Sequence, residues 1–274
     1  MHNKLTMING NEIYYESYLQ QPSAPTIILL HGFLSSTFSF RWLIPLLRKE
    51  YNVLSIDLPP FGKSGKSHSY IYSNENHAMT VIQLCEKLDL NAITLIGHSM
   101  GGQIALNISY LKPDLVDQCI LLCSSAYLKK SKRSLVLSSY LPFFHFFVKR
   151  YLEKSGVEKN LRNVVYDHSK IDVEMEKGYL EPFLEERIFP ALTRMIRDHE
   201  GDLPVQFLRK IDTPCLLIWG EHDKVVPLQI GKRLHGDLKN AKLIVLKDTG
   251  HLVPEEKPEE VFQLIKEYIK ETKQ

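Results

Sequence analysis

The chain of 274 residues has only four cysteines, and their positions argue against a disulfide framework. Cys119 and Cys123 share one apolar run, residues 119–123, of the kind that forms a β-strand. In a strand their Cα atoms lie ~13 Å apart, at ~3.3 Å per residue, which is too far for a disulfide bond. Cys85 falls in a helical pattern, and Cys215 begins another apolar run. We therefore expect buried, reduced thiols and a reducing compartment, the cytoplasm.

Long apolar segments and an excess of charge are lacking as well. No run reaches the length of a transmembrane helix, and residues 1–4 (MHNK) do not resemble the apolar part of a signal peptide. The 34 basic and 32 acidic residues leave a net charge of +2, a balance that argues against nucleic acid as a partner. We expect a cytoplasmic protein without a membrane span.

The chain instead alternates between strand and helix patterns. A turn signal at residues 9–11 (NGN) predicts a hairpin, and residues 21–25 read as a loop. Apolar runs without polar alternation predict strands that are buried on both faces, at residues 26–30, 52–56, 93–96, 119–123, 214–219 and 242–246. With 44% hydrophobic residues the chain can bury a full core. An α/β fold is therefore expected.

The alternation stops at residue 127 and returns after residue 203. No strand pattern of comparable quality occurs between these points. Helical patterns, punctuated by proline and glycine, occupy residues 133–140, 143–153, 174–184 and 188–198. We therefore predict a core formed by residues 1–126 and 204–274, with residues 127–203 inserted as a helical cap or lid.

The segment Gly97–Gly102 (GHSMGG) stands where an apolar strand pattern becomes a helical one. The glycines on either side of Ser99 let strand and helix approach closely in a tight, strained turn. The hydroxyl of Ser99 is then exposed at the end of the strand, and the helix N-terminus favours developing negative charge. Ser99 is the candidate nucleophile. The alternative, a serine in an ordinary βα turn, is disfavoured by this strand–turn–helix context.

Two further residues complete a candidate catalytic triad. Asp223 follows the run at 214–219, and His251 follows the run at 242–246. Sites in open α/β sheets assemble at the C-terminal ends of the strands. A serine hydroxyl needs a base, so His251 is expected to take its proton while Asp223 orients the imidazole and stabilises the imidazolium.

Acyl transfer also needs hydrogen-bond donors for the oxyanion of the intermediate. The backbone N–H of Met100, which follows the nucleophile, is one candidate. The second is the N–H of Phe33, in the loop after the run at residues 26–30. His31 is expected to fix this loop and His98 to pack against its neighbours.

Other polar residues are assigned no chemistry. Asp57 also follows a strand and is a rival acid, but its place before the nucleophile and its proline-rich loop favour a structural role. The spacing of His222 to other ligand types does not suggest a metal site, and no paired His/Cys spacing supports zinc.

Two features of the predicted cap leave alternatives open. The aromatic run contains Phe143, Phe144, Phe146 and Phe147. It either packs on the core or forms an apolar wall over an acyl pocket or an interfacial contact. The basic run at residues 129–133 is either a solvated face or a binding surface.

These motifs resemble the α/β-hydrolase fold superfamily. The matching segments are His31–Phe33 (HGF), the loop Asp57–Ser64, Gly97–Gly102, Gly220–Asp223 (GEHD) and Gly250–His251. The resemblance implies a mostly parallel, eight-stranded, doubly wound sheet with a helical cap, and a serine mechanism without metal or cofactor. Pro60 replaces a glycine that is usual in the loop after Asp57, a departure that does not touch the triad.

The resemblance is greatest to small carboxylesterases, which are often grouped with cofactor-free haloperoxidases. It implies a small-molecule ester substrate and an acyl-enzyme route. Dehalogenases and epoxide hydrolases of this fold use aspartate where Ser99 stands. The alternatives are a carbon–carbon bond hydrolase, which usually has asparagine at the position of His98, a slow ligand receptor, or a menaquinone-pathway-type synthase. Such a synthase needs a cap arginine, for which the candidates are Arg150, Arg187, Arg194 and Arg197. The oligomeric state is left open.

Overall fold

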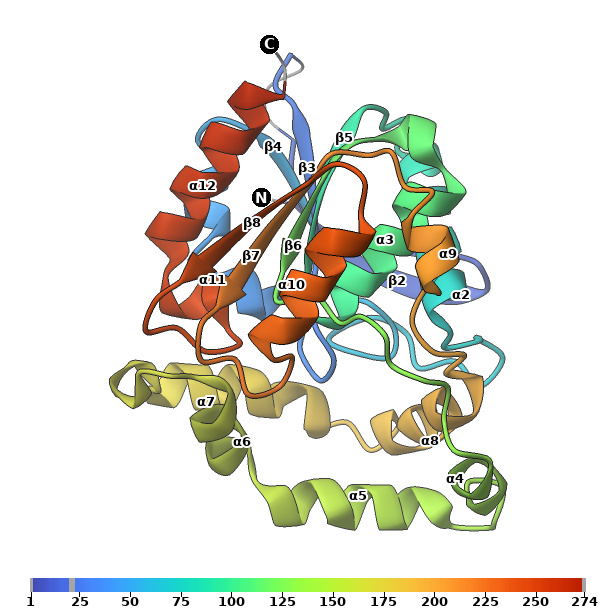
Figure 1. Cartoon of the computed structure of the whole chain (residues 1–274). Coiled ribbons are helices and arrows are strands. Elements are labelled where there is room, and N and C mark those ends of the chain that lie inside the picture. Colours follow the sequence, from blue (N-terminus) through green and yellow to red (C-terminus); the bar gives the residue numbers. More distant parts are fainter. Residues whose placement is uncertain (1, 20–22, 273–274) are drawn as a thin grey trace.

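One eight-stranded sheet runs through the molecule in the order β1-β2-β4-β3-β5-β6-β7-β8 (Figure 1). The structure, a computed structural model, describes residues 2–19 and 23–272, so the loop expected at residues 21–25 lies partly outside the described residues. The strands are β1 (His2–Ile8), β2 (Asn11–Tyr18), β3 (Thr26–Leu30), β4 (Asn52–Ile56), β5 (Ile93–His98), β6 (Val116–Leu122), β7 (Cys215–Gly220) and β8 (Ala241–Leu246).

The pairing of these strands confirms the expected sheet. β1 and β2 form an antiparallel hairpin, and β2 also pairs antiparallel with β4. Every remaining neighbouring pair, from β4 through β8, is parallel. The central strands β4, β5 and β7 are buried along their whole length, because helices cover both faces of the sheet.

Helices lie on both sides of the sheet (Figure 1). One side carries α1 (Ile44–Leu47), α11 (Val253–Glu256) and α12 (Pro258–Glu271). The other side carries α2 (Asn74–Lys87), α3 (Met100–Leu111), α9 (Val205–Leu208) and α10 (Leu228–Asp237). Short 3₁₀ turns are η1 (Thr37–Phe40) and η2 (Pro113–Leu115). Within the described part of the chain, no helix combines the length and the apolar character needed to cross a bilayer.

A helical insertion, α4 to α8, forms a layer beneath this core in Figure 1. The backbone bridge between Lys129 and Gly201 brings its two ends together. This pairing supports the division of core and cap at residues 127 and 203, which stays a prediction. The cap helices are α4 (Arg133–Ser138), α5 (Phe144–Ser155), α6 (Val157–Val164), α7 (Val173–Leu180) and α8 (Ile188–Asp198), with turns η3 (His168–Lys170) and η4 (Glu181–Phe183).

Candidate active site

Ser99 occupies the sharp turn between β5 and α3, with φ 52° and ψ −116°. Positions 97 and 101, on either side of this turn, have no room for a side chain and therefore require glycine. A Cβ added to Gly97 would lie 2.3 Å from the Gly101 carbonyl oxygen, and one added to Gly101 would lie 2.1 Å from that of Leu30. The turn is held from below by the Ser99 N–H, which donates to the Leu122 carbonyl at 3.0 Å. The strained backbone lifts the Ser99 side chain into a cavity.

The loops that follow β7 and β8 bring the expected acid and base together. His251 Nδ1 lies 2.7 Å from Asp223 Oδ2, and both side chains are buried. Asp223 Oδ1 accepts hydrogen bonds from the backbone N–H groups of Val225 and Val226, at 2.8 and 2.9 Å. Because Asp223 accepts the Nδ1 proton, Nε2 of a neutral His251 is left free to act as a base.

His98 supports this arrangement through a contact that the sequence did not indicate. Its Nε2 lies 2.9 Å from the His251 carbonyl oxygen, and the two rings are 4.8 Å apart. Burial lowers the pKa of His98 to about 3, so the ring is neutral and Nε2 carries the proton that it donates. His98 thus links His251, the expected base, to β5, the strand that leads to Ser99. The sequence GHSMGG alone could not have predicted this contact, because it does not show that His98 lies beside His251.

The expected oxyanion loop lies directly against the nucleophile. A Cβ added to Gly32 would be 3.2 Å from the Cβ of Ser99. Phe33, Ser99 and Met100 line the same cavity. Among the described residues, no hydrogen bond uses the backbone N–H of Phe33 or of Met100, so both donors are available to a ligand.

His31 holds that loop in place. Its Nε2 accepts the Leu58 N–H at 2.8 Å, and its Nδ1 donates to the Gly32 carbonyl at 2.7 Å. Complete burial lowers the pKa of His31 to about 4, so the imidazole is neutral, with one nitrogen that donates a hydrogen bond and one that accepts. Its ring links the loops that follow β3 and β4.

Asp57 is engaged away from the nucleophile. Its two carboxylate oxygens accept the backbone N–H groups of Thr37 and Lys63, each at 2.7 Å. A Cβ on Gly62 would come within 2.0 Å of this carboxylate. The loop after β4 therefore folds tightly around Asp57, which gives the residue a structural role.

A cavity of about 770 Å³ opens above Ser99. The apolar part of its wall comes from α8, from the loop before α10 and from α10 itself, through Leu192, Met195, Ile196, Val226, Pro227 and Ile230. A polar part comes from Asn74, His77, Ser125, His199 and Asp202. Pockets of this size and character hold small organic molecules.

Phe143, Phe144, Phe146 and Phe147 do not line this cavity, so the alternative in which they form the wall of an acyl pocket finds no support in its lining. The reason is the order of layers in the cap. Val148 and Leu152 of α5 pack on a cluster that contains Ile188 and Leu192 of α8, so α8 separates α5 from the core. The sequence left the alternatives open because amphipathic patterns on both helices do not reveal which helix lies inside.

The cap arginines are likewise absent from the cavity wall. Arg194 pairs with Asp198, and Arg197 donates to Ser139. Among the described residues, the arginine that lines the cavity is Arg233 of α10, whose guanidinium lies 3.7 Å above the ring of Tyr127.

A chain of hydrogen bonds fixes the proton of His77 at the polar part of the wall. Thr80 Oγ1 donates to the Asn76 carbonyl, so it accepts from the Tyr70 hydroxyl at 2.8 Å. The Tyr70 oxygen therefore accepts from His77 Nδ1 at 3.1 Å. Burial lowers the pKa of His77 to about 3, which leaves Nε2 as an acceptor that no described residue uses.

One group of side chains among the described residues has the composition of a metal site: Cys123, Asp223 and His251. Its chemistry does not fit a metal. Asp223 and His251 already bond to each other, and burial raises the pKa of the Cys123 thiol well above its usual value. A thiol held in its neutral form beside Asp223 and His251 is a poor ligand.

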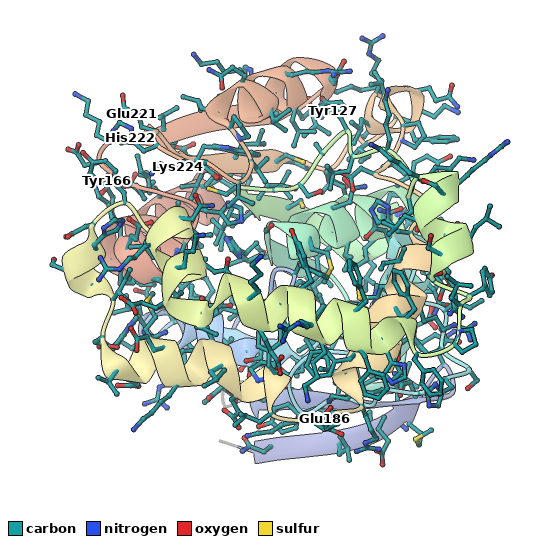
Figure 2. All side chains as sticks on the ribbon, turned by 90° about the horizontal axis from the view of Figure 1, so that it is seen from below. Tyr127, Tyr166, Glu186, Glu221, His222 and Lys224 are labelled. Atoms are coloured by element: carbon teal, nitrogen blue, oxygen red, sulfur yellow. The ribbon has the colours of Figure 1, made fainter. Side chains whose placement is uncertain are left out.

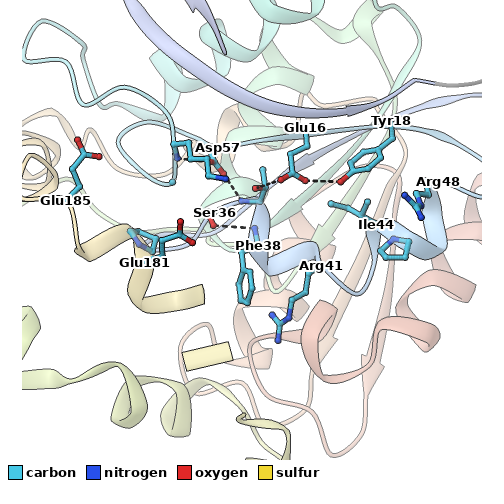
Figure 3. A pocket seen from close by; sticks show the side chains of 15 residues that line it. Glu16, Tyr18, Ser36, Phe38, Arg41, Ile44, Arg48, Asp57, Glu181 and Glu185 are labelled. Carbon is cyan, nitrogen blue, oxygen red and sulfur yellow. Dashed lines mark hydrogen bonds between the residues drawn. The ribbon is translucent and has the colours of Figure 1, made fainter. Parts of the chain in front are cut away.

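A second cavity of about 490 Å³ lies on the other side of the loop that holds Asp57 (Figure 3). Its wall includes Glu16, Arg41, Arg48 and Glu181. Glu16 accepts from the Tyr18 hydroxyl, and Arg41 pairs with the buried Glu255. Ser99 lines the first cavity and does not line this one, so the candidate active site is the cavity above Ser99.

The sheet topology, the strained serine and the buried Asp–His pair together define a hydrolase of the α/β class. A family model described as "alpha/beta hydrolase fold" matches residues 25–258. The chain therefore belongs to the α/β-hydrolase fold family.

Individual relatives agree with this assignment. The chain is 52% identical over 263 residues to the uncharacterized hydrolase YugF of Bacillus subtilis (strain 168), with 96% of each chain covered. Its structure is similar to that of an esterase from Thermogutta terrifontis, with TM-score 0.81, 20% identity and 99% of each chain covered. It is also similar to a bromoperoxidase from Bacillus anthracis, with TM-score 0.76, 22% identity, and coverage of 98% of this chain and 100% of that one. At these identities, the two structures show a shared fold.

Proposed function

We propose that this protein is a serine hydrolase that cleaves a carboxylic ester through an acyl-enzyme. The observation that carries the proposal is the 2.7 Å contact between His251 Nδ1 and Asp223 Oδ2, together with the strained turn that holds Ser99. In this order of strands and loops, the three side chains have the roles of nucleophile, base and orienting acid.

In the proposed first half-reaction, Ser99 Oγ attacks the carbonyl carbon of the ester. Its proton passes to His251 Nε2, and Asp223 stabilises the resulting imidazolium. The N–H groups of Phe33 and Met100 donate to the oxyanion, and a single such donor contributes ~10²–10³ in rate. Collapse of the intermediate transfers the proton to the leaving alcohol.

In the second half-reaction, His251 removes a proton from water, which attacks the acyl-enzyme and releases the acid. The cavity favours a small substrate with an apolar body, because α8 and the loop before α10 form an apolar wall.

The test is hydrolysis of p-nitrophenyl esters of increasing acyl length. We expect turnover with kcat in the ordinary ~1–10³ s⁻¹ range. Ser99→Ala and Asp223→Asn should each lower kcat/KM by ~10⁴-fold or more, while the matched control Ser134→Ala, at an exposed position on α4, should keep full activity.

One outcome would reject the ester-hydrolase proposal: no ester turned over by a protein whose Ser99 still reacts with a fluorophosphonate. That result would favour carbon–carbon cleavage, elimination or a receptor role. Elimination with a cap arginine already finds little support, since none of Arg150, Arg187, Arg194 and Arg197 lines the cavity.

A further inference from the structure

The outer layer of the cap, residues 129–154, exposes an unusual amount of apolar surface. Leu137 and Phe143 are 71% and 72% exposed, and Tyr151 is 69% exposed. Further exposed apolar side chains in this layer are Leu135, Tyr140, Leu141, Phe146 and Phe147. Contiguous apolar patches on soluble proteins mark sites of interaction with proteins or membranes.

The apolar side chains of α5 are divided between two faces. Val148 and Leu152 point inward and pack beside α8. Phe147 and Tyr151 are four residues apart on α5, which places them in one row on the solvent side, and Phe143 is exposed just before the helix begins. Figure 2, which views the molecule from the cap side, shows α5 running across the front with no element over it. The row is therefore open to a partner.

The conformation of Phe143 sets it apart from an ordinary surface residue. It precedes α5 with φ 63° and ψ 11°, in the left-handed region that a bulky side chain seldom adopts. Because the ring is 72% exposed, packing within this chain contributes little stabilisation to offset the strain. Strain at an exposed aromatic residue points to a contact outside the chain.

The same layer concentrates positive charge. Residues 129–154 contain seven of the chain's 34 basic residues and one of its 32 acidic residues, a net charge of +6, so the rest of the chain carries −4. Six of these bases are exposed and form no ion pair with another described residue: Lys129, Lys130, Lys132, Arg133, Arg150 and Lys154. On α5, Arg150 and Lys154 lie in the row beside Phe147 and Tyr151.

We propose that the cap layer of residues 129–154 binds the surface of an anionic phospholipid bilayer. Aromatic and leucine side chains enter the boundary between headgroups and acyl chains, while arginine and lysine side chains extend to the lipid phosphates. Each such base near an anionic surface strengthens binding about fivefold. The protein lies on the membrane through this face and does not cross it.

A second copy of the chain is a poorer occupant of this face. A twofold dimer would place the +6 layer of one copy against the same layer of the other. The like charges would oppose association, whereas an anionic bilayer complements them.

The layer also adjoins the candidate active site. Leu128 and Ser131, which flank Lys129 and Lys130, line the cavity above Ser99. A membrane that contacts the layer would therefore meet the protein beside the cavity wall. The inference about the membrane does not depend on which reaction the site performs.

The experiment is sedimentation of the full chain with sucrose-loaded vesicles, either of pure phosphatidylcholine or with about 30% phosphatidylglycerol. We expect at least a tenfold stronger partition to the anionic vesicles, and weaker binding at high salt. A charge variant (Arg133→Glu, Arg150→Glu, Lys154→Glu) and an aromatic variant (Phe143→Asn, Phe147→Ser, Tyr151→Ser) should each lose at least tenfold. Since all six positions are exposed, both variants should fold.

The matched control variants make the same kinds of substitution at exposed positions outside the cap layer. Lys49→Glu, Lys232→Glu and Lys270→Glu reverse three exposed bases of the core, and Leu5→Ser with Met7→Ser removes exposed apolar side chains of β1. Both controls should bind vesicles like the wild type. Absence of wild-type binding, or equal loss in the controls, would overturn the proposal. So would a stable dimer in analytical ultracentrifugation that the aromatic variant dissociates and that binds no vesicles.

Discussion

At the scale of single residues, the site depends on one strained backbone position. Ser99 has φ 52° and ψ −116°, and two glycines leave the turn no room to relax. Strain of this kind costs about 1–3 kcal/mol and persists only where the surrounding structure holds it. The turn presents the Ser99 hydroxyl to the cavity. The strain that positions this proposed nucleophile therefore lowers the free energy of unfolding.

Glycine at position 99 should recover part of this strain. Because glycine adopts positive φ easily, we expect Ser99→Gly to be more stable than Ser99→Ala by about 1 kcal/mol, or about 2–4 °C in Tm. Both variants lack the hydroxyl, so the comparison isolates the backbone. Thermal unfolding of the two proteins side by side is the measurement, and an equal or lower Tm for the glycine variant would contradict the strain argument.

Buried neutral histidines should make the fold sensitive to acid. The pKa of His98 is about 3 in the fold, against about 6.5 in an unfolded chain. Below pH 6.5 the unfolded chain binds the extra proton, so the stability that this histidine contributes at neutral pH is lost as the pH falls. At pH 5 the loss reaches about 2 kcal/mol.

The variant His98→Gln carries no titrating group there. Its free energy of unfolding should therefore fall by about 2 kcal/mol less than that of the wild type between pH 7.5 and pH 5. Urea denaturation at both pH values measures the difference. Parallel losses in the two proteins would show that His98 is already charged in the fold.

At the scale of elements, the sequence predicted the sheet well because its strands are continuous apolar runs. All six of the predicted core strands are present, with ends that shift by three residues or fewer. Residues 38–49 do not form a single helix, since the chain forms η1 and α1 there with turns between them. Pro45 falls at the start of α1 and limits how far a single helix can extend.

Helix ends were less predictable because capping acts through single side chains. α2 begins at Asn74 because the Ser73 side chain accepts the Asn76 N–H and caps the helix. α6 was not predicted, since its eight residues carry few apolar positions. The order of layers in the cap depends on long-range packing, which local patterns do not encode.

The cavity wall formed by α8 should set the preference for substrate length. Ile196 of α8 lines the cavity and is only half-buried, so a larger side chain can be placed there without disrupting the core. We expect Ile196→Trp to raise KM for long-chain esters about tenfold and to leave short esters unchanged.

Phe147→Trp is the matched control, since Phe147 lies on the outer face of the cap. Michaelis–Menten kinetics across the acyl series measure both variants. An equal effect of the two substitutions would show that α8 does not form the acyl wall.

At the scale of the whole molecule, both the core and the cap contribute residues to the candidate active site. The core supplies the turn that holds Ser99 and the proposed acid and base, while α8 of the cap forms part of the wall of the cavity above Ser99. A backbone contact joins the two parts at the base itself, because the His251 N–H donates to the Val164 carbonyl at the end of α6, at 2.7 Å. The same insertion carries the basic, aromatic layer on its outer side.

The motifs that predict the triad each stand at a strand end, where the topology brings distant residues together. Ser99, Asp223 and His251 could be proposed from order and position alone. The roles of His98 and His77 could not, since each depends on a hydrogen bond to a residue or a backbone group that the sequence does not place beside it.

The central claim is that Ser99 carries the acyl group during turnover. Rapid mixing with p-nitrophenyl butyrate, followed by acid quench and peptide mass spectrometry, tests it most directly. The account predicts a mass increase of one butyryl group on the peptide that contains Ser99, and none in Ser99→Ala. Turnover of the ester without acylation of that peptide, or with acylation of another residue, would contradict it.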